Sequence, residues 1–256
     1  MPSRCKIRLA PFRFRQANLP RLGSLSDMRR PNFIAKHARN AQGLLGRVIA
    51  FIMAHETWSQ NLRVMDALRI GRSDHIIDVG CGHGRSLSEL ATRASMGHVV
   101  GADPSDLMVE IASQRNRPLI DAARVKVVLA TVESLPFADE SFDKVLCVHV
   151  LYFWKDLDAS LREVARVLKP GGRSGLLFRT KADPAAIASF PAEIYRFPEL
   201  AEVTEALEQA GLDVHAASDR SNEPVLLIAE KRRAQTAEGP QSTDQAETIA
   251  VRRAIT

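Results

Sequence analysis

The sequence predicts an α/β protein with a mostly parallel sheet that carries helices on both faces. Short apolar runs alternate with segments of helical period between residues 75 and 231, which is typical of parallel strands joined by crossover helices. A turn with glycine at alternate positions, Gly80–Gly84, separates the first apolar run from a helical segment. The chain has 256 residues, 45% of them hydrophobic and 25% charged, which is enough for one such domain with extensions.

Two helices are expected before the first strand, because apolar residues recur at helical spacing from Phe33 to Met53 and from Trp58 to Leu68. Parallel strands are expected at His75–Val79, His98–Ala102, Val125–Leu129, Lys144–Val148 and Arg173–Phe178. Helices are expected at Arg85–Ala94, Asp106–Arg115, Leu157–Leu168 and Glu199–Ala210. Lys169–Gly172 is interpreted as a helix stop followed by a turn. A final antiparallel pair is expected at Leu212–Ala216 and Pro224–Glu230.

The composition divides the chain into four parts. Residues 1–31 carry four prolines and many arginines without a steady period, which predicts a disordered basic leader. Residues 32–70 form the cap helices, residues 71–231 the ligand-binding domain, and the polar residues 232–256 a disordered tail. The net charge is +5, so the alternative for the leader is contact with nucleic acid or an anionic membrane. Met28 is a second candidate start.

The cysteines and the hydropathy indicate the cellular compartment in which the protein is expected. Cys5, Cys81 and Cys147 are odd in number and far apart, so neither a disulfide framework nor a zinc site is expected. No cluster of metal-ligating residues stands out in the sequence. No run of 18 apolar residues and no secretory signal is visible. These observations favour a cytoplasmic protein with reduced thiols.

The glycine turn and the next strand end indicate a nucleoside-like ligand. A dinucleotide turn needs G-x-G-x-x-G, and Arg85 occupies the position of its last glycine. A phosphate loop needs Gly-Lys-Ser/Thr, which is absent from the sequence. Asp103 ends the second apolar strand about twenty residues later, where a carboxylate can accept hydrogen bonds from ribose hydroxyls. The alternative is that Asp103 only caps the following helix.

Three segments resemble a known family. Asp78–Gly84 (D-V-G-C-G-H-G) resembles the first motif, D/E-x-G-x-G-x-G, of class I S-adenosylmethionine-dependent methyltransferases. Ala130–Val145 resembles the G-D-A-E-x-L-P-F-x-D-x-S-F-D-x-V stretch of their small-molecule branch, but Thr131 stands where the family has an adenine-binding Asp. Leu161–Gly172 resembles the L-x-E-x-x-R-V-L-K-P-G-G segment, whose role there is architectural.

The resemblance covers residues 58–231 and looks closest to the branch that includes the ubiquinone/menaquinone biosynthesis methyltransferases. It implies a Rossmann-like, seven-stranded, mostly parallel sheet with N-terminal cap helices, and S-adenosyl-L-methionine as the methyl donor. The donor-binding positions that it implies are Asp78, Gly80, Cys81, Gly82, Gly84, Asp103, Pro104, Ser105, Met108, Thr131, Val132, Glu133 and His149.

The segment His149–Trp154 is expected to line the acceptor side, because ligands bind beyond the carboxyl ends of parallel strands. It lacks the Asn/Asp-Pro-Pro-Tyr/Phe and Pro-Cys patterns of DNA-base methyltransferases, so a small-molecule or lipid-like acceptor is expected instead. Tyr152, Phe153 and Trp154 form either an apolar wall or core packing. His149 is the candidate general base, with packing beside the sulfonium as the alternative. Residues 44–54 and the basic leader would allow peripheral membrane contact.

Two rival functions stay open at this point. A non-catalytic protein of the same fold that binds an adenosyl ligand is favoured by Thr131 alone. An NAD-linked oxidoreductase is opposed by Arg85 and by the two later motifs.

Overall fold

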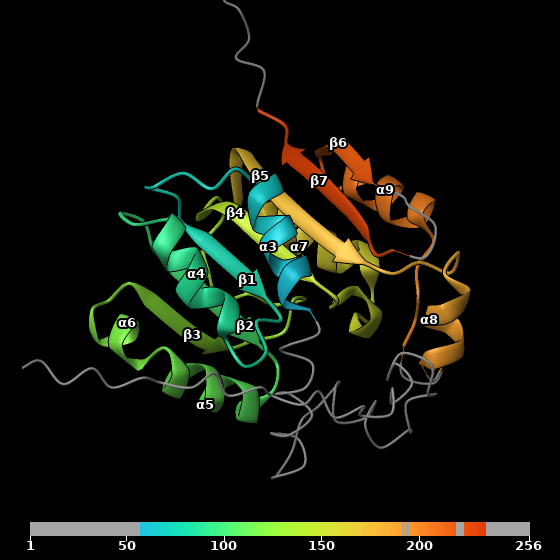
Figure 1. Ribbon diagram of the computed structural model, residues 1–256. Helices are drawn as coiled ribbons and strands as arrows, with labels where there is room; N and C mark the ends of the chain where they lie inside the picture. The colour runs from blue at the N-terminus through green and yellow to red at the C-terminus, as the bar shows by residue number, and fades with distance from the viewer. Residues whose placement is uncertain (1–56, 191, 193–194, 219–222, 234–256) are drawn as a thin grey trace, which may run out of the picture.

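A computed structural model describes residues 57–190, 192, 195–218 and 223–233. They contain a seven-stranded sheet of order β3-β2-β1-β4-β5-β7-β6, shown in Figure 1. The predicted leader, the predicted helix at 33–53 and the chain after residue 233 lie outside the described residues. Among the described helices, none is long and apolar enough to cross a membrane.

The strands follow the predicted order. The parallel strands are β1 Ile76–Val79, β2 Val99–Asp103, β3 Val125–Leu129, β4 Phe142–Val148 and β5 Leu168–Phe178. The last two strands, β6 Leu212–Ser218 and β7 Val225–Lys231, run antiparallel to each other, and β7 is antiparallel to β5. The predicted mostly parallel, Rossmann-like sheet with an antiparallel final pair is therefore confirmed.

Helices connect the strands as predicted, with three additions. The predicted helices are α3 Trp58–Ala67, α4 Arg85–Arg93, α5 Asp106–Arg115, α7 Leu157–Val167 and α9 Leu200–Gln209. The additions are α6 Arg117–Asp121, the 3-10 turn η2 Leu151–Phe153 and α8 Pro184–Ser189. Each is six residues or shorter, so none carries enough helical period to be found in sequence.

The sheet buries side chains on both faces, because neighbouring residues of a strand point to opposite sides. Ile76 belongs to the core layer that contains Val64 of α3 and Leu87 of α4. Ile77 belongs to the other layer, with Leu161 of α7 and other apolar residues of α7 and α9. Figure 1 accordingly shows α3 and α4 on the near face of the sheet and α7 behind it.

The predicted boundary between α7 and β5 was wrong. The helix ends at Val167 and β5 begins at once with Leu168, although a turn was expected over residues 169–172. Leu168 pairs with Phe142, and the next pair joins Arg173 to Lys144. Residues 169–172 therefore bulge opposite a single residue of β4, which a glycine-containing segment can do without ending the strand.

Candidate active site

The site lies where the order of the strands reverses. The chain runs outward from β1 to β2 and β3, then returns to pair β4 on the other side of β1. Ligands of open α/β sheets bind at such a switch point, beyond the carboxyl ends of the strands. Gly80 follows β1 and Val150 lies just beyond β4, and a Cβ built on Gly80 would lie 2.3 Å from a Val150 methyl carbon. The two loops thus touch across the switch point.

The three glycines of the turn differ in what surrounds them. Gly80, Gly82 and Gly84 have φ of +75°, +54° and +71°, a left-handed conformation that favours glycine. A Cβ on Gly84 would lie 2.7 Å from the Cβ of Ala112, so this glycine lets α5 pack against the turn. Among the described residues, a Cβ on Gly82 would meet no atom within 4 Å. Of the three glycines, Gly82 is therefore the one whose surroundings leave room for a ligand, and its contact with a donor stays a prediction.

Asp103 joins the glycine turn to the end of β2. One carboxylate oxygen accepts a 2.9 Å hydrogen bond from the Gly82 N–H, and the other accepts one of 2.9 Å from the Ser105 N–H. Burial raises the pKa of Asp103, and these two N–H groups oppose that rise. A carboxylate offers about four lone-pair positions, so acceptor capacity remains for a ligand. The side chain that caps α5 is Ser105 and not Asp103, so the capping alternative does not hold.

Asp78 anchors the helix that follows the turn. Its side chain is buried and accepts a close hydrogen bond from the Ser86 hydroxyl on α4. Burial raises the pKa of Asp78 to about 6, although the Ser86 hydrogen bond opposes this. Asp78 therefore holds β1 to α4, and its contact with a donor stays a prediction. Cys81 is buried beside Gly101, where it acts as a small apolar side chain.

The segment expected at the adenine begins next to Asp103. The Ala130 N–H donates a 3.1 Å hydrogen bond to the Asp103 carbonyl. Val132 is buried, whereas Thr131 and Glu133 are exposed. Of the remaining predicted donor positions, Pro104 is exposed, and Ser105 and Met108 are buried at the start of α5. Their donor contacts stay predictions.

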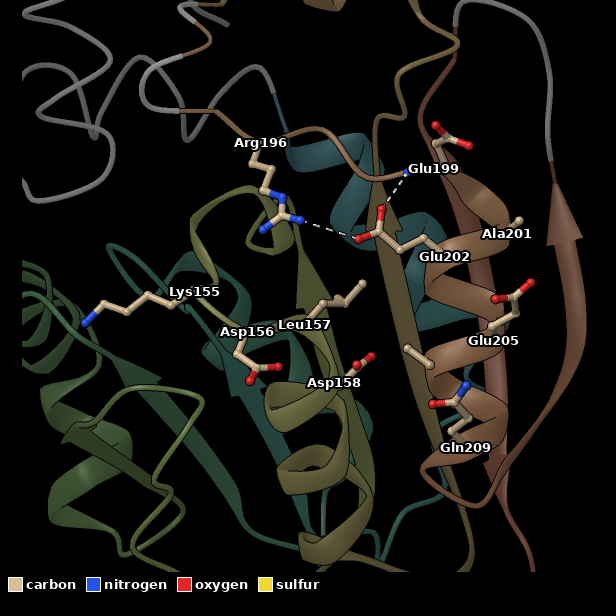
Figure 2. A pocket seen from close by; sticks show the side chains of 11 residues that line it. Lys155, Asp156, Leu157, Asp158, Arg196, Glu199, Ala201, Glu202, Glu205 and Gln209 are labelled. Carbon is tan, nitrogen blue, oxygen red and sulfur yellow. Dashed lines mark hydrogen bonds and ion pairs between the residues drawn. The ribbon is translucent and has the colours of Figure 1, made fainter.

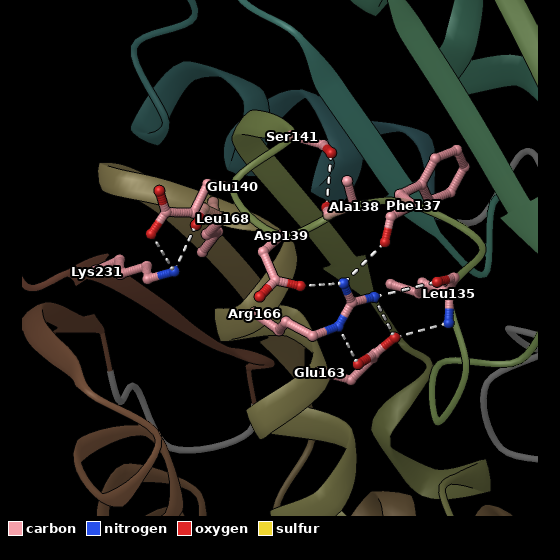
Figure 3. Close-up of polar contacts among 10 residues, drawn as sticks. All are labelled: Leu135, Phe137, Ala138, Asp139, Glu140, Ser141, Glu163, Arg166, Leu168 and Lys231. Carbon is pink, nitrogen blue, oxygen red and sulfur yellow. Dashed lines mark hydrogen bonds and ion pairs between the residues drawn. The ribbon is translucent and has the colours of Figure 1, made fainter.

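The second and third segments that resemble the family, Ala130–Val145 and Leu161–Gly172, are bonded to each other (Figure 3). Glu163 of α7 accepts a 2.8 Å hydrogen bond from the Leu135 N–H. The Arg166 guanidinium donates to the carbonyls of Leu135 and Phe137, at 3.1 and 2.8 Å, and pairs with Asp139 and Glu163 at 2.7 Å each. The architectural role expected for this helix therefore includes fixing the loop that approaches Thr131.

His149 is held by hydrogen bonds at both ring nitrogens. The Tyr152 hydroxyl oxygen accepts from the Arg179 N–H at 2.6 Å and lies 2.9 Å from His149 Nδ1. Because the Gln60 side-chain oxygen of α3 can only accept, its close contact assigns the ring proton to Nε2, and Nδ1 then accepts from the Tyr152 hydroxyl.

This arrangement opposes a role for His149 as a general base. Burial, helped by the positive charge of Arg179, lowers the pKa of His149 to about 3. The ring is neutral at physiological pH, and its single lone pair is already occupied by Tyr152. The geometry supports the packing alternative, and proton abstraction by His149 stays an untested prediction.

The aromatic residues after β4 divide into core and surface. Tyr152 is 5% exposed and packs against Tyr195 and Phe197, so it is core. Phe153 and Trp154 are half-buried and pack against the same core, so they are the members of the predicted wall that keep some exposed surface. Sequence reasoning missed Tyr195 and Phe197, which lie in a segment without a period. It also missed Gln60, 89 residues from its partner His149.

A separate pocket of about 660 Å³ lies between the start of α7 and α9 (Figure 2). Its lining includes Asp156, Asp158, Glu199, Glu202 and Glu205, so it is predominantly acidic. Glu202 is engaged by Arg196 at 3.8 Å and by the Glu199 N–H at 3.4 Å. None of the predicted donor positions lines this pocket. Within the described ranges, no group of three His, Cys, Asp or Glu residues could hold a metal ion.

Comparison with known proteins agrees with this geometry. Residues 77–175 match the family described as methyltransferase domain. The uncharacterized methyltransferase YdaC of Bacillus subtilis is 29% identical over 146 residues, which cover 56% of this chain and 78% of YdaC. The ubiquinone/menaquinone biosynthesis C-methyltransferase UbiE of Geotalea daltonii is 33% identical over 134 residues, 52% of this chain and 56% of UbiE. The chain thus spans little more than half the length of that relative.

One solved structure of a methyltransferase has a similar fold and contains bound ligands. The crystal structure of geranyl diphosphate C-methyltransferase from Streptomyces coelicolor, in complex with Mg²⁺, geranyl diphosphate and S-adenosyl-L-homocysteine, has a TM-score of 0.60 and 18% identity. The match covers 75% of this chain and 86% of that chain. The sheet order and the switch-point turn are those of a Rossmann-like methyltransferase fold. Residues 77–175 match the methyltransferase domain family, and the chain is similar to methyltransferases over this region.

Proposed function

We propose that this methyltransferase transfers a methyl group to a small-molecule or lipid-like acceptor beyond the carboxyl ends of β1 and β4. The observation that carries the proposal is the environment of Gly82. Its N–H is fixed by Asp103, and no atom of the described residues lies within 4 Å on its Cβ side. An open, left-handed glycine at a switch point fits a ligand that lies directly on the backbone.

The residues around Gly82 fit an adenosyl donor. The free acceptor positions of Asp103 suit the two ribose hydroxyls. The segment after β3 begins at Asp103, where the Ala130 N–H bonds to the Asp103 carbonyl, and the exposed Thr131 hydroxyl can offer one hydrogen bond to the adenine. A hydroxyl gives a weaker, uncharged bond than the Asp that the family places there.

For methyl transfer, the protein mainly has to position the donor and the acceptor. S-adenosylmethionine supplies a methyl group that its sulfonium already activates. Gly80 and Val150 bring the two loops into contact at the switch point, and the His149 ring is immobilised by Gln60 and Tyr152. These residues can orient the reactants and exclude water, which accounts for large rate factors without a covalent step.

The acceptor class rests on the residues beyond β4. Phe153 and Trp154 are half-buried aromatic side chains at the carboxyl edge, which suits an apolar or aromatic acceptor. UbiE is named for ubiquinone/menaquinone biosynthesis, and the other enzyme for geranyl diphosphate, which joins an apolar chain to a diphosphate. We extend the small-molecule or lipid-like class of acceptor to the present chain. The free buried thiols of Cys81 and Cys147 suit a reducing cytoplasm. Peripheral membrane contact through residues 44–54 stays a prediction outside the described residues.

Methyl transfer from donor labelled in the methyl group tests this proposal. The protein is incubated with separate small-molecule, lipid, DNA and protein fractions of a cell extract, and the labelled product is isolated. We expect label in the small-molecule or lipid fraction. Label confined to DNA or protein would contradict the proposed acceptor class.

The same assay addresses the second candidate, an adenosyl-binding protein without turnover. Thr131, in place of the family's Asp, is the observation that favours it. Tight binding of S-adenosylhomocysteine together with no label in any fraction would support this candidate and overturn the proposal.

A further inference from the structure

Arg179 is a half-buried cation just beyond β5, and among the described residues its guanidinium pairs with Asp183 alone. Its Nη1 makes a close ion pair with Asp183, the residue that caps α8 through a 3.0 Å hydrogen bond from the Ala186 N–H. The Arg179 side chain is 27% exposed, whereas that of Asp183 is 4% exposed. Within the part of the chain that the structure describes, its Nε and Nη2 atoms have no recorded partner.

Hydrogen bonds connect Arg179 to the candidate active site. Its backbone N–H donates to the Tyr152 hydroxyl, which contacts His149. His149 is followed by Val150, which faces Gly80 across the switch point. Figure 1 shows β5 ending beside β4, with α8 beyond its carboxyl end. Arg179 therefore lies on the acceptor side of the same edge that carries the glycine turn.

The edge of the Arg179 guanidinium formed by Nε and Nη2, which has no partner among the described residues, is suited to one kind of ligand. Nε and Nη2 form a planar pair of donors that matches the two oxygens of a carboxylate or phosphate. Asp183 occupies the opposite end of the guanidinium and so fixes which edge remains available. Partial burial strengthens such a charge-assisted contact relative to one in water. Phe153 and Trp154 follow β4 at the same edge of the sheet and are half-buried, so this edge also carries apolar surface.

We propose that Arg179 binds an oxyanion, a carboxylate or a phosphate, carried by the methyl acceptor. This inference rests on the proposed function and narrows it to acceptors that combine an apolar body with an anionic group. Arg179 is thus a specificity-determining residue. The alternative role, to neutralise the buried Asp183 alone, predicts no preference for anionic ligands.

Three small probes test the inference on the full chain saturated with S-adenosylhomocysteine. Benzoate and phenyl phosphate carry an oxyanion, and benzamide has the shape of benzoate without the charge. Binding of each probe is measured by ligand-observed NMR titration for the wild type, Arg179→Gln and Arg179→Lys. Lys181→Gln is the matched control, because Lys181 is an exposed cation two residues further on, paired with Glu199 at 3.3 Å.

We expect the wild type and Lys181→Gln to bind benzoate or phenyl phosphate at least about tenfold more tightly than benzamide. Arg179→Gln should lose this preference, and Arg179→Lys should keep part of it, because lysine retains the charge but not the fork. Which anion binds more tightly separates a carboxylate from a phosphate acceptor.

Equal binding of the three probes by the wild type, binding of none, or an unchanged preference in Arg179→Gln would overturn the inference. Since Arg179→Gln leaves Asp183 buried without its partner, the double variant Arg179→Gln/Asp183→Asn removes both charges and should show the same loss. Binding of S-adenosylhomocysteine, measured separately, distinguishes failure of the proposed function from failure of the Arg179 inference. If the protein does not bind S-adenosylhomocysteine, the proposed function fails. If it binds S-adenosylhomocysteine but shows none of the expected anion preference, only the role of Arg179 fails.

Discussion

The proposed donor half and the proposed acceptor half of the site differ in the groups that hold them together: backbone N–H groups in the first and side chains in the second. At the ends of β1 and β2, the donor half uses backbone N–H groups, as in the hydrogen bond from Gly82 to Asp103, 21 residues apart. At the ends of β4 and β5, the acceptor half uses side chains brought from distant segments, as in Gln60 and His149, 89 residues apart. A backbone-built site suits a ligand shared by a whole family, whereas side chains can change with each acceptor.

Gly80 joins the two halves, so its substitution should have the largest effect. Gly80→Ala combines a positive φ with a 2.3 Å overlap with Val150, and we expect a loss of about 4 kcal/mol in the free energy of unfolding. The added methyl group of Gly82→Ala meets no atom of the described residues, so this change should cost only about 1 kcal/mol, while weakening donor binding at least about tenfold. Urea unfolding and calorimetry measure both quantities. Equal stability losses in the two variants would break the distinction between a packing glycine and a binding glycine.

Asp78 allows the electrostatics of the donor half to be measured. Its pKa is raised from 3.8 to about 6, so the folded protein keeps a proton that the unfolded chain loses between these values. The contribution of Asp78 to stability therefore falls as pH rises through this window, by about 3 kcal/mol in total. The stability of the wild type relative to Asp78→Asn should decline accordingly in unfolding measurements at several pH values. Parallel pH profiles for the two proteins would contradict the buried, Ser86-bonded carboxylate.

The contacts of Arg166 and Glu163 with residues 135–139, here called the clamp, hold the loop after β3. Removing the clamp tests whether the proposed donor half also depends on side chains from distant segments. Arg166→Met removes the donors to two carbonyls and the partner of Glu163, and we expect a loss of about 2 kcal/mol in unfolding free energy. Arg162→Met, an exposed position on the same helix, is the control and should change stability by less than about 0.5 kcal/mol. Similar behaviour of the two variants would show that the clamp is only a surface ion-pair cluster.

Substitution of Asp103 tests the predicted contact with the ribose hydroxyls of the donor. Asp103→Ala should weaken binding of the donor by more than about tenfold, about 1.4 kcal/mol, through lost charge-assisted hydrogen bonds. Asp106→Ala, three residues along the chain and exposed, should bind the donor as the wild type does. If calorimetry finds unchanged affinity in Asp103→Ala, the carboxylate serves only to tie β2 to the glycine turn.

The strands and helices around the glycine turn were predicted well because their signals are local. Strand β3 and helix α5 were predicted with the bounds that the structure shows, and the glycine turn lies at the predicted strand end. Gly80–Gly84 and Asp103 each carry a backbone requirement that is visible in a few neighbouring letters. The role of Gly82 as the open glycine, by contrast, needed the positions of Val150 and Ala112.

The acceptor half was predicted poorly because its contacts join segments far apart in the chain. No periodicity brings Gln60 to His149, or the Tyr152 hydroxyl to the Arg179 backbone 27 residues away. The predicted aromatic wall was partly core, since Tyr152 is enclosed by Tyr195 and Phe197. The turn expected at Lys169–Gly172 became a bulge because Phe142, outside the predicted strand, pairs with Leu168.

The central claim, that the turn at Gly80–Gly84 and Asp103 bind an adenosyl methyl donor, is tested most directly by isothermal calorimetry. The full chain is titrated with S-adenosylmethionine, S-adenosylhomocysteine and NAD in turn. We predict saturable binding of both adenosyl compounds and no binding of NAD, because Arg85 replaces the glycine that a dinucleotide turn requires. Binding of NAD, or no binding of either adenosyl compound at millimolar concentration, would contradict this account.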